Sequence, residues 1–309
     1  MGNSMSSSRV ANFIIGGTEK AGTTSVYTYL AAHPEVCSSA NKETDFFREK
    51  FTGDLSVDRE NYASCFPLCQ GSTPIVMEAS PGYLGEAEIV VPRLSSLVPD
   101  VKLLFILRDP IERLYSSFKF HQGKLDLPDD MTFEDYVGKC MAFDSGDKSA
   151  ADLGVGEWFL KTLAFGKYAD YLQRYYECFP DAHIKVMFFE QLKEDVEGFM
   201  REVSEYIGID SGYWDGFEFR KENVTFSGKN KALHAIAMRI NAVMEPQLRR
   251  RPGLKRTLLG VYKKINQARE GYEPMPEPVR RDLEQYYQPC NESLATLLGD
   301  ARAPWQAGI

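Results

Sequence analysis

Apolar runs alternate along most of the chain with stretches of helical periodicity. The apolar runs predict strands at residues 11–17, 35–38, 74–79, 101–107 and 183–190. VKLLFIL at 101–107 is almost continuously apolar, as is typical of a central parallel strand that is covered on both faces. Helices are expected between and after these runs, at residues 23–32, 86–98, 110–122, 157–178, 193–207, 232–246 and 279–298.

Strands that alternate with helices predict a mostly parallel, doubly wound sheet of the P-loop-like α/β class, flanked by helices. In such sheets ligands bind beyond the carboxyl ends of the strands. The loops after the first strand, after residues 75–79 and after residues 101–107 should therefore converge. Pro92 should interrupt the helix at 86–98, because proline has no backbone N–H to donate within a helix.

We expect one domain over residues 11–300, preceded by a disordered tail at residues 1–10. A polar insertion at about 123–155 contains a short predicted helix near 132–142. An insertion of this length is typical of a functional loop, so it is a candidate lid.

The stretch FIIGGTEKAGTTS at 13–25 predicts a buried strand, a glycine-rich turn and a helix start. The spacing from Gly17 to Gly22 nearly matches a Walker A loop, but Thr23 stands where an ATP-binding loop carries its lysine. The lysine lies inside the turn instead, at Lys20. Backbone amides and the positive end of the helix dipole favour an anion there, so the turn predicts a phosphate cradle for something other than a triphosphate. Its expected ligands are Lys20, Ala21, Gly22, Thr23, Thr24 and Ser25.

A second anion site is predicted in LRDPIERLYSSF at 107–118. Arg108 leaves the carboxyl end of a central strand, and Asp109 and Pro110 have the N-cap and first-turn chemistry of a helix start. Ser116 follows on that helix, so the guanidinium and the hydroxyl can reach one phosphate. A surface Arg–Asp pair beside an exposed serine is the plainer alternative. Together with the first turn, the motif predicts two anion sites for one ligand.

Composition and charge restrict the class of partner. The 309 residues include 43% hydrophobic and 26% charged residues, which is ordinary for a globular enzyme. The formal net charge of -8 argues against a general nucleic-acid binder, although residues 246–256 are basic. No apolar run approaches the ~20 residues that a membrane span needs, and the N-terminus has no hydrophobic signal core. We therefore expect a cytoplasmic protein.

Six cysteines do not make a disulfide framework in a chain of this length. Cys65 and Cys69 lie four residues apart. They are expected either to pair in an oxidising compartment or to stay as thiols in the reducing cytosol.

Four motifs occur together, and a fifth, weaker one follows them. They are K-A-G-T-T-S (20–25), K-E-T-D-F-F (42–47), M-E-A-S-P-G-Y (77–83), L-R-D-P-I-E-R-L-Y-S-S-F (107–118) and N-V-T-F-S-G-K-N-K-A-L (223–233). In this order they resemble the motifs of the sulfotransferases that use 3′-phosphoadenosine-5′-phosphosulfate (PAPS). The likeness is greatest to the heparan-sulfate type and its bacterial relatives.

This resemblance assigns the two anion sites to one donor. It implies that the first turn binds the 5′-phosphosulfate and that Arg108 and Ser116 bind the 3′-phosphate. The position of Lys20 then makes sense, because PAPS has no β- and γ-phosphates and the lysine would meet the bridging oxygen of the leaving group. Lys229 and Lys231 lie in a segment that resembles the loop closing over the cofactor.

The resemblance also implies a catalytic carboxylate at Glu43, with Asp45 as a weaker second candidate. A neutral hydroxyl is a poor nucleophile and needs a base as it attacks. One position departs from the heparan type, which usually carries a lysine just after the glutamate that matches Glu78. Ala79 stands there in this chain, and Lys42 is a candidate to replace the missing charge in catalysis.

The predicted activity is transfer of a sulfuryl group from PAPS to an acceptor hydroxyl, leaving PAP, with no metal required. A P-loop small-molecule kinase is one alternative, but it needs the Walker lysine that this turn lacks. A non-catalytic PAP- or nucleotide-binding protein is another. The acceptor is expected to be a carbohydrate or a small metabolite; the sequence distinguishes neither a hydroxyl from an amine acceptor nor the oligomeric state.

Overall fold

The structure is a computed structural model, and it describes residues 9–69, 71, 73–128, 130–220, 274–299 and 303–306. The chain forms two compact units. The first comprises Met1–Arg113, Leu163–Asn223 and Asp282–Ile309, and the second comprises Leu114–Thr162 and Val224–Arg281. The predicted tail, the predicted helix at 232–246 and the basic segment at 246–256 fall outside the described residues, apart from the end of the tail.

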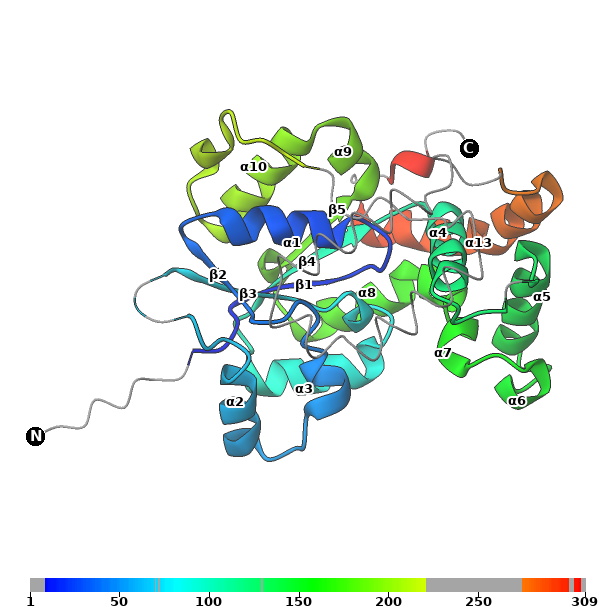
Figure 1. Ribbon diagram of the computed structural model, residues 1–309, viewed down its shortest axis with the longest axis horizontal. Coiled ribbons are helices and arrows are strands. Elements are labelled where there is room, and N and C mark those ends of the chain that lie inside the picture. The colour runs from blue at the N-terminus through cyan, green and yellow to red at the C-terminus, as the bar shows by residue number, and fades with distance from the viewer. Residues whose placement is uncertain are drawn as a thin grey trace, which may run out of the picture. The chain divides into compact units, whose positions relative to one another are not determined.

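A parallel β-sheet forms the centre of the first unit (Figure 1). The strands lie in the order β2-β3-β1-β4-β5, and all neighbouring pairs are parallel. Each predicted strand is confirmed with shifts of a few residues at its ends, and the sheet confirms the predicted α/β class. The strands are β1 (Phe13–Gly17), β2 (Val36–Ser38), β3 (Ile75–Ala79), β4 (Lys102–Leu107) and β5 (Ile184–Phe188).

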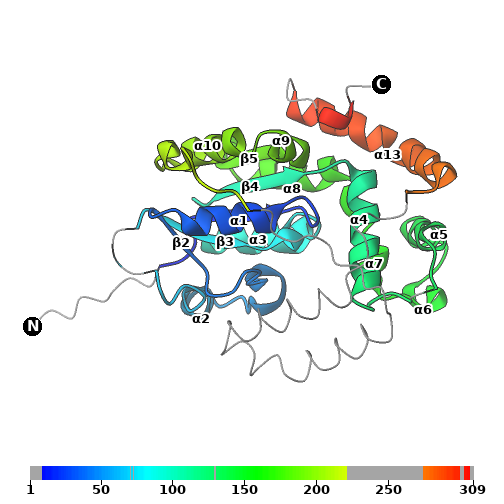
Figure 2. The ribbon, with the colours of Figure 1, turned by 45° about the horizontal axis from the view of Figure 1, so that its top comes forward.

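Helices cover both faces of this sheet. Figure 2 shows α1 and α10 on one side of it and α2 on the other, as does the view of Figure 1. The helices that pack on one face are α1 (Thr23–Ala32), α9 (Phe189–Glu194) and α10 (Val196–Ile207). Those that pack on the opposite face are α2 (Leu55–Ala63), α3 (Ala87–Leu97) and α8 (Tyr168–Cys178). Helices α4 (Pro110–Gly123) and α13 (Glu277–Leu298) each have residues in both units.

The sheet has a hydrophobic core on each face, which explains why the sequences of its strands are continuous apolar runs. Successive side chains of a strand point to opposite faces of the sheet. Ile14 and Phe105 lie in the core beneath α3 and α8, whereas Ile15 and Leu104 lie in the core beneath α1 and α10. A strand that is buried on both faces has no polar face, so its sequence does not alternate.

The predicted break at Pro92 is wrong, because α3 runs through this proline. Proline removes one helical hydrogen bond, which leaves the carbonyl of Glu88 without its usual donor. Both residues are exposed, so water can solvate the helix at this position. The cost of the proline is therefore small enough for the packing of Val91 and Leu94 to keep the helix intact.

The single helix predicted at 157–178 is also wrong. The segment divides into α7 (Glu157–Leu160), a 3₁₀ turn at Ala164–Gly166 and α8. At Gly166 a Cβ atom would lie 2.7 Å from the ring of Tyr287 and 2.9 Å from Pro110. This close approach of three segments fixes the turn, and helical periodicity alone does not reveal it.

Helix α2 was not predicted, although its start carries a sequence signal. Asp54 caps it by accepting hydrogen bonds from the backbone amides of Ser56 and Val57. An aspartate at this position is a common helix start. The segment has few apolar residues, so its periodicity is weak.

The second unit contains short helices whose starts are capped by side chains. Thr132 caps α5 (Phe133–Asp144) and Ser149 caps α6 (Ala150–Leu153), each in a reciprocal capping box. The hydroxyl of Tyr136 donates to the carbonyl of Phe159 at 2.7 Å. The helix predicted near 132–142 is thus confirmed as α5, whereas the role of the insertion as a lid stays a prediction.

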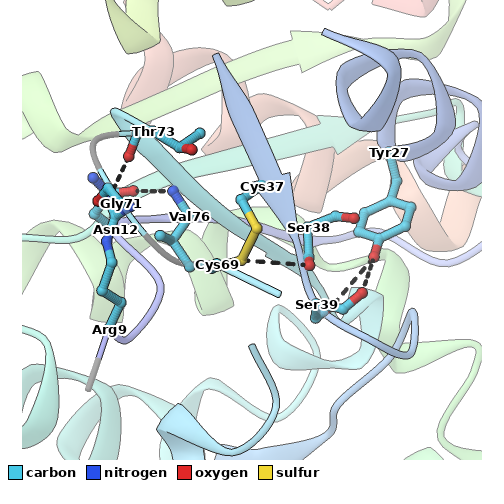
Figure 3. Close-up of a disulfide and its surroundings, with 10 residues drawn as sticks. All are labelled: Arg9, Asn12, Tyr27, Cys37, Ser38, Ser39, Cys69, Gly71, Thr73 and Val76. Atoms are coloured by element: carbon cyan, nitrogen blue, oxygen red, sulfur yellow. Dashed lines mark hydrogen bonds between the residues drawn. A yellow bond between two sulfur atoms is a disulfide. The ribbon is translucent and has the colours of Figure 1, made fainter. Parts of the chain in front are cut away.

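A disulfide joins Cys37 on β2 to Cys69 in the loop after α2 (Figure 3). Both alternatives considered from the sequence are therefore wrong for Cys69, which is neither paired with Cys65 nor a thiol, whereas Cys65 remains a thiol. The two bonded cysteines are 32 residues apart, with their Cα atoms 5.5 Å from each other. This pairing depends on β2 lying beside the loop, which spacing in the sequence does not show.

The disulfide fixes the end of β2, the strand that leads into residues 39–45. The backbone amide of Ala40 also donates to the carbonyl of Cys65 at 2.9 Å. On the other side, the hydroxyl of Tyr27 donates to the carbonyl of Ser39 at 3.0 Å (Figure 3). The segment that carries Glu43 therefore starts from an anchored strand end.

Candidate functional site

The glycine-rich turn after β1 is packed tightly against its neighbours. The amide of Thr18 donates to the carbonyl of Ile106 at 2.8 Å, and the amide of Leu84 donates to that of Gly16 at 2.8 Å. A Cβ atom on Gly17 would lie 2.6 Å from the Cβ of Leu84. Glycine is required here because β4 and the segment after β3 approach the turn so closely.

Helix α1 starts directly after this turn, as predicted from the sequence. Gly22 is its N-cap, with a left-handed φ of 80°, and glycine has no side chain with which to cap the helix. The amides of Ser25 and Val26 donate to the carbonyl of Gly22 at 3.0 and 3.2 Å, which closes the first turn. The amides at the start of α1 and the positive end of its dipole therefore form a site suited to an anion.

Replacing Gly22 by alanine tests this geometry. A Cβ atom at Gly22 would lie 2.7 Å from Leu192 and 3.0 Å from Phe189. Gly53 has a φ of 96° but no atom within 4 Å of its Cβ position, so it is a matched control for backbone strain alone. We expect the free energy of unfolding to fall by about 1–2 kcal/mol more in Gly22→Ala than in Gly53→Ala, measured by urea denaturation. Equal losses in the two variants would show that the turn has room for a side chain.

Arg108 lies against the first turn. Its Nη1 donates to the carbonyl of Lys20 at 2.9 Å, and its guanidinium carbon lies 4.8 Å from the ring centre of Phe189. The hydroxyl of Tyr168 donates to the carbonyl of Arg108 at 2.7 Å. Burial lowers the pKa of the guanidinium, although arginine stays charged at any physiological pH. The structure thus brings together the cationic residues of the two anion sites predicted from the sequence.

Three other predicted ligands do not belong to the described part of the first unit. Ser116 lies on the part of α4 that belongs to the second unit. Lys229 and Lys231 lie outside the described residues. The contribution of all three to nucleotide binding stays a prediction.

The segment after β2 carries Lys42 and Glu43. The Glu43 side chain is 52% exposed and pairs with the Lys42 ammonium at 3.0 Å. The backbone amide of Glu43 donates to the carbonyl of Ala79 at 3.0 Å, which places this residue at the carboxyl end of β3. Ala79 itself is buried, and the Lys42 ammonium beside Glu43 comes from the segment that pairs with this residue.

Asp45 is less available than Glu43 as a base. Its carboxylate pairs with Arg48 at 3.3 Å, and its pKa is raised mainly by burial. Phe46 and Phe47 follow it and are buried in the core, where each ring centre lies 4.9 Å from that of Tyr62. The exposed carboxylate of Glu43 is therefore the better placed of the two to meet an acceptor.

Sequence reasoning missed a buried polar network beneath this segment. Glu78 is fully buried at the end of β3, and the hydroxyl of Thr44 donates to its carboxylate. Burial raises the pKa of Glu78 to about 7. The sequence did contain a signal for this network, namely a glutamate inside the otherwise apolar strand IVMEA. Burying such a side chain is costly unless it has a hydrogen-bond partner.

The sheet, the glycine-rich turn and the adjacent Arg108 define a P-loop-type α/β protein whose turn, at the carboxyl edge of a parallel sheet, is suited to an anion. The family description "Sulfotransferase domain" matches residues 11–225. The chain belongs to this sulfotransferase family, which confirms the resemblance seen in its motifs.

Sequence comparison with known proteins also finds sulfotransferases. The chain is 28% identical over 204 residues to "Bifunctional heparan sulfate N-deacetylase/N-sulfotransferase 3" of Homo sapiens, which covers 65% of this chain and 22% of that protein. It is 27% identical over 212 residues to "Bifunctional heparan sulfate N-deacetylase/N-sulfotransferase" of Drosophila melanogaster, covering 64% of this chain and 19% of that protein. The matched region therefore spans about a fifth of the length of these relatives.

A solved structure agrees with the fold over nearly the whole chain. The sulfotransferase from Alicyclobacillus acidocaldarius superposes with a TM-score of 0.64 at 21% identity, covering 96% of this chain and 99% of that one. This likeness confirms the fold. The roles of individual side chains rest on the geometry described above.

Proposed function

We propose that the protein transfers a sulfuryl group from PAPS to an acceptor and releases PAP. The observation that carries this proposal is the hydrogen bond from Arg108 to the carbonyl of Lys20. It joins a cation at the end of β4 to a phosphate cradle at the end of β1, which suits a nucleotide with phosphates at both 5′ and 3′. Membership of the sulfotransferase family supports this donor over the ATP of a kinase.

The cradle would hold the 5′-phosphosulfate through the amides from Ala21 to Thr24 and the hydroxyl of Ser25, with Lys20 beside the oxygen that bridges phosphorus and sulfur. Arg108 would bind the 3′-phosphate through its planar guanidinium. Ser116 would add a hydroxyl to that phosphate. Lys229 and Lys231 would close over the bound nucleotide.

Glu43 would act as the general base. It would take the proton from the acceptor as the acceptor oxygen or nitrogen forms its bond to sulfur. The bond from sulfur to the bridging oxygen breaks in the same step, and its electrons stay on the departing phosphate. Lys20 and the amides of the cradle would stabilise that charge, because donors that are fixed in place before the reaction need no reorganisation as the charge develops.

Lys42 would supply the second catalytic cation, in place of a lysine at position 79. Its side chain is only 17% exposed, and its ammonium lies 3.0 Å from the Glu43 carboxylate. From this position its ion pair would orient the Glu43 carboxylate.

The acceptor would be a carbohydrate or a small metabolite. The named relatives are heparan sulfate N-sulfotransferases, so an amino sugar should be tested beside hydroxyl acceptors.

No described helix has the length and apolar character of a membrane span. In the described part of the chain, no three His, Cys, Asp or Glu side chains are grouped as metal ligands. The cytoplasmic location expected from the sequence stays a prediction, and the Cys37–Cys69 disulfide favours an oxidising compartment instead.

Nucleotide preference tests the donor directly. We expect thermal unfolding to shift upward with PAP far more than with AMP, which lacks the 3′-phosphate, or with ATP and Mg²⁺. Arg108→Ala should lower the affinity for PAP about 10- to 100-fold and leave that for AMP nearly unchanged, because it removes a charged hydrogen bond to the 3′-phosphate. Isothermal titration calorimetry measures both affinities.

Arg201→Ala is the control, since Arg201 pairs with Glu197 on the surface of α10. It should bind PAP like the wild type. Equal wild-type affinities for PAP and AMP would contradict the 3′-phosphate site. Stronger binding of ATP with Mg²⁺ would favour a kinase, and PAP binding without transfer from PAPS to any acceptor would favour a non-catalytic protein.

A further inference from the structure

The segment that carries Glu43 is held by three consecutive residues at the end of β3. The carbonyl of Ala79 accepts from the amide of Glu43 at 3.0 Å, and the hydroxyl of Ser80 accepts from the amide of Asp45 at 3.2 Å. Between them, the carboxylate of Glu78 accepts from the hydroxyl of Thr44. Each residue from 43 to 45 thus donates one hydrogen bond to a residue from 78 to 80. Of these three hydrogen bonds, only the one between Thr44 and Glu78 joins two side chains.

The segment needs such support because its backbone is unfavourable. Glu43 has a φ of 65° and Asp45 a φ of 48°, and neither is a glycine. Left-handed backbone is disfavoured for residues with a Cβ atom, so it persists only where neighbouring contacts impose it. Thr44 lies between these two residues and is buried, with 4% of its surface exposed. A contact that fixes Thr44 therefore fixes the turn on both sides of it.

Glu78 is an unexpected residue to find at this position. It is fully buried, and the hydroxyls of Tyr62 and Tyr83 lie beside its carboxylate. Its neighbours on β3, Met77 and Ala79, are apolar and equally buried. An apolar side chain of similar size would pack here without the cost of burying a carboxylate. The acidic group is thus explained by the hydrogen bond that it accepts rather than by packing.

We propose that Glu78 is a positioning residue for sulfuryl transfer. Through the Thr44 hydroxyl it holds the left-handed turn that presents the Glu43 carboxylate at the carboxyl edge of the sheet. Glu78 itself is too deeply buried to touch the acceptor. The inference rests on the proposed function, because it requires Glu43 to be the base.

Substitution at Thr44 tests the link while keeping the shape of the core. Thr44→Val removes the hydroxyl that donates to Glu78 and should lower kcat about 10- to 100-fold, since a displacement of about 1 Å in a catalytic group has an effect of this size. The affinity for PAP, measured by calorimetry, should change less than twofold. Thr44→Ser keeps the donor and should restore most of kcat. A merely structural defect would lower PAP affinity and thermal stability together with kcat.

Thr52→Val is the matched control. The Thr52 hydroxyl donates at 2.9 Å to the carboxylate of Asp58, which is also fully buried. The same chemical change is thus made in a hydrogen bond that does not involve the residues from 43 to 45, and kcat should stay at the wild-type value while stability falls.

Variants of Glu78 complete the test. Glu78→Leu should lower kcat as Thr44→Val does, and the double variant should lose no more than the worse single variant, because both remove one hydrogen bond. Glu78→Gln keeps an acceptor oxygen and should retain more activity than Glu78→Leu. Wild-type kcat in Thr44→Val, or fully additive losses in the double variant, would overturn the inference. Glu43→Gln in the same assay tests the base separately: if it alone is inactive, the proposed function stands while the positioning role fails.

Discussion

Glu43→Gln is expected to lower kcat by about 10²- to 10⁴-fold, the usual contribution of a positioned general base. The glutamine side chain has nearly the same shape but accepts no proton at neutral pH. The Glu43 side chain is half-exposed and lies outside the cradle after β1, so PAP should bind the variant as tightly as the wild type. Turnover of PAPS with a saturating acceptor, together with calorimetry on PAP, separates the two effects.

Glu49→Gln provides the control for this change. Glu49 belongs to the same region, is 58% exposed and pairs with Arg48 at 3.2 Å. Glu49 has no role in the proposed mechanism, so the Glu49→Gln variant should have the wild-type kcat. Full activity of Glu43→Gln would remove this residue from the base role and would direct attention to Asp45. Loss of PAP binding in Glu43→Gln would instead place the residue in the nucleotide site.

The sheet and the cradle could be predicted because local sequence determines both. Apolar runs buried on both faces give strands irrespective of their partners, and the close packing of Gly17 beneath Leu84 requires a residue without a side chain. The contact of Arg108 with Lys20 also follows from sequence, since both residues leave carboxyl ends of neighbouring parallel strands. Strand ends that converge bring their loops together wherever the sheet is parallel.

The features that were missed depend on contacts between distant segments. Cys69 pairs with Cys37 only because β2 lies beside the loop after α2, and a spacing of four residues to Cys65 has no bearing on that. The turn at Gly166 follows from the approach of Tyr287 from the far end of the sequence. Glu78 belongs to a motif that the sequence analysis named, but the hydrogen bond that it accepts from Thr44 joins β3 to the segment after β2. A contact between two separate segments does not follow from the motif.

Glu78 should also make the stability of the protein depend on pH. Burial raises its pKa from the ordinary value of 4.5 to about 7, although the hydroxyls of Thr44, Tyr83 and Tyr62 oppose the shift. Between these two values the folded protein keeps a proton that the unfolded chain has released. The free energy of unfolding therefore falls as pH rises through this window, by about 3 kcal/mol in total from this group. The contribution is fully present below pH 4.5 and is lost above pH 7.

Glu78→Gln isolates this contribution, because the amide does not titrate and still accepts a hydrogen bond. Urea denaturation of both proteins from pH 4.5 to 8 should show the wild type losing about 3 kcal/mol relative to the variant as pH rises. The titratable groups that interact electrostatically with Glu78, namely Asp45, Tyr62, Cys65 and Tyr83, are present in both proteins. Tyr62 and Tyr83 stay neutral because burial raises each pKa well above 10, and burial also raises the pKa values of Asp45 and Cys65. Glu49→Gln, at an exposed site, should give a curve parallel to that of the wild type. If the curve of Glu78→Gln is also parallel to that of the wild type, Glu78 has the same pKa in the folded and the unfolded protein. That result would contradict the burial of its carboxyl group beneath Thr44.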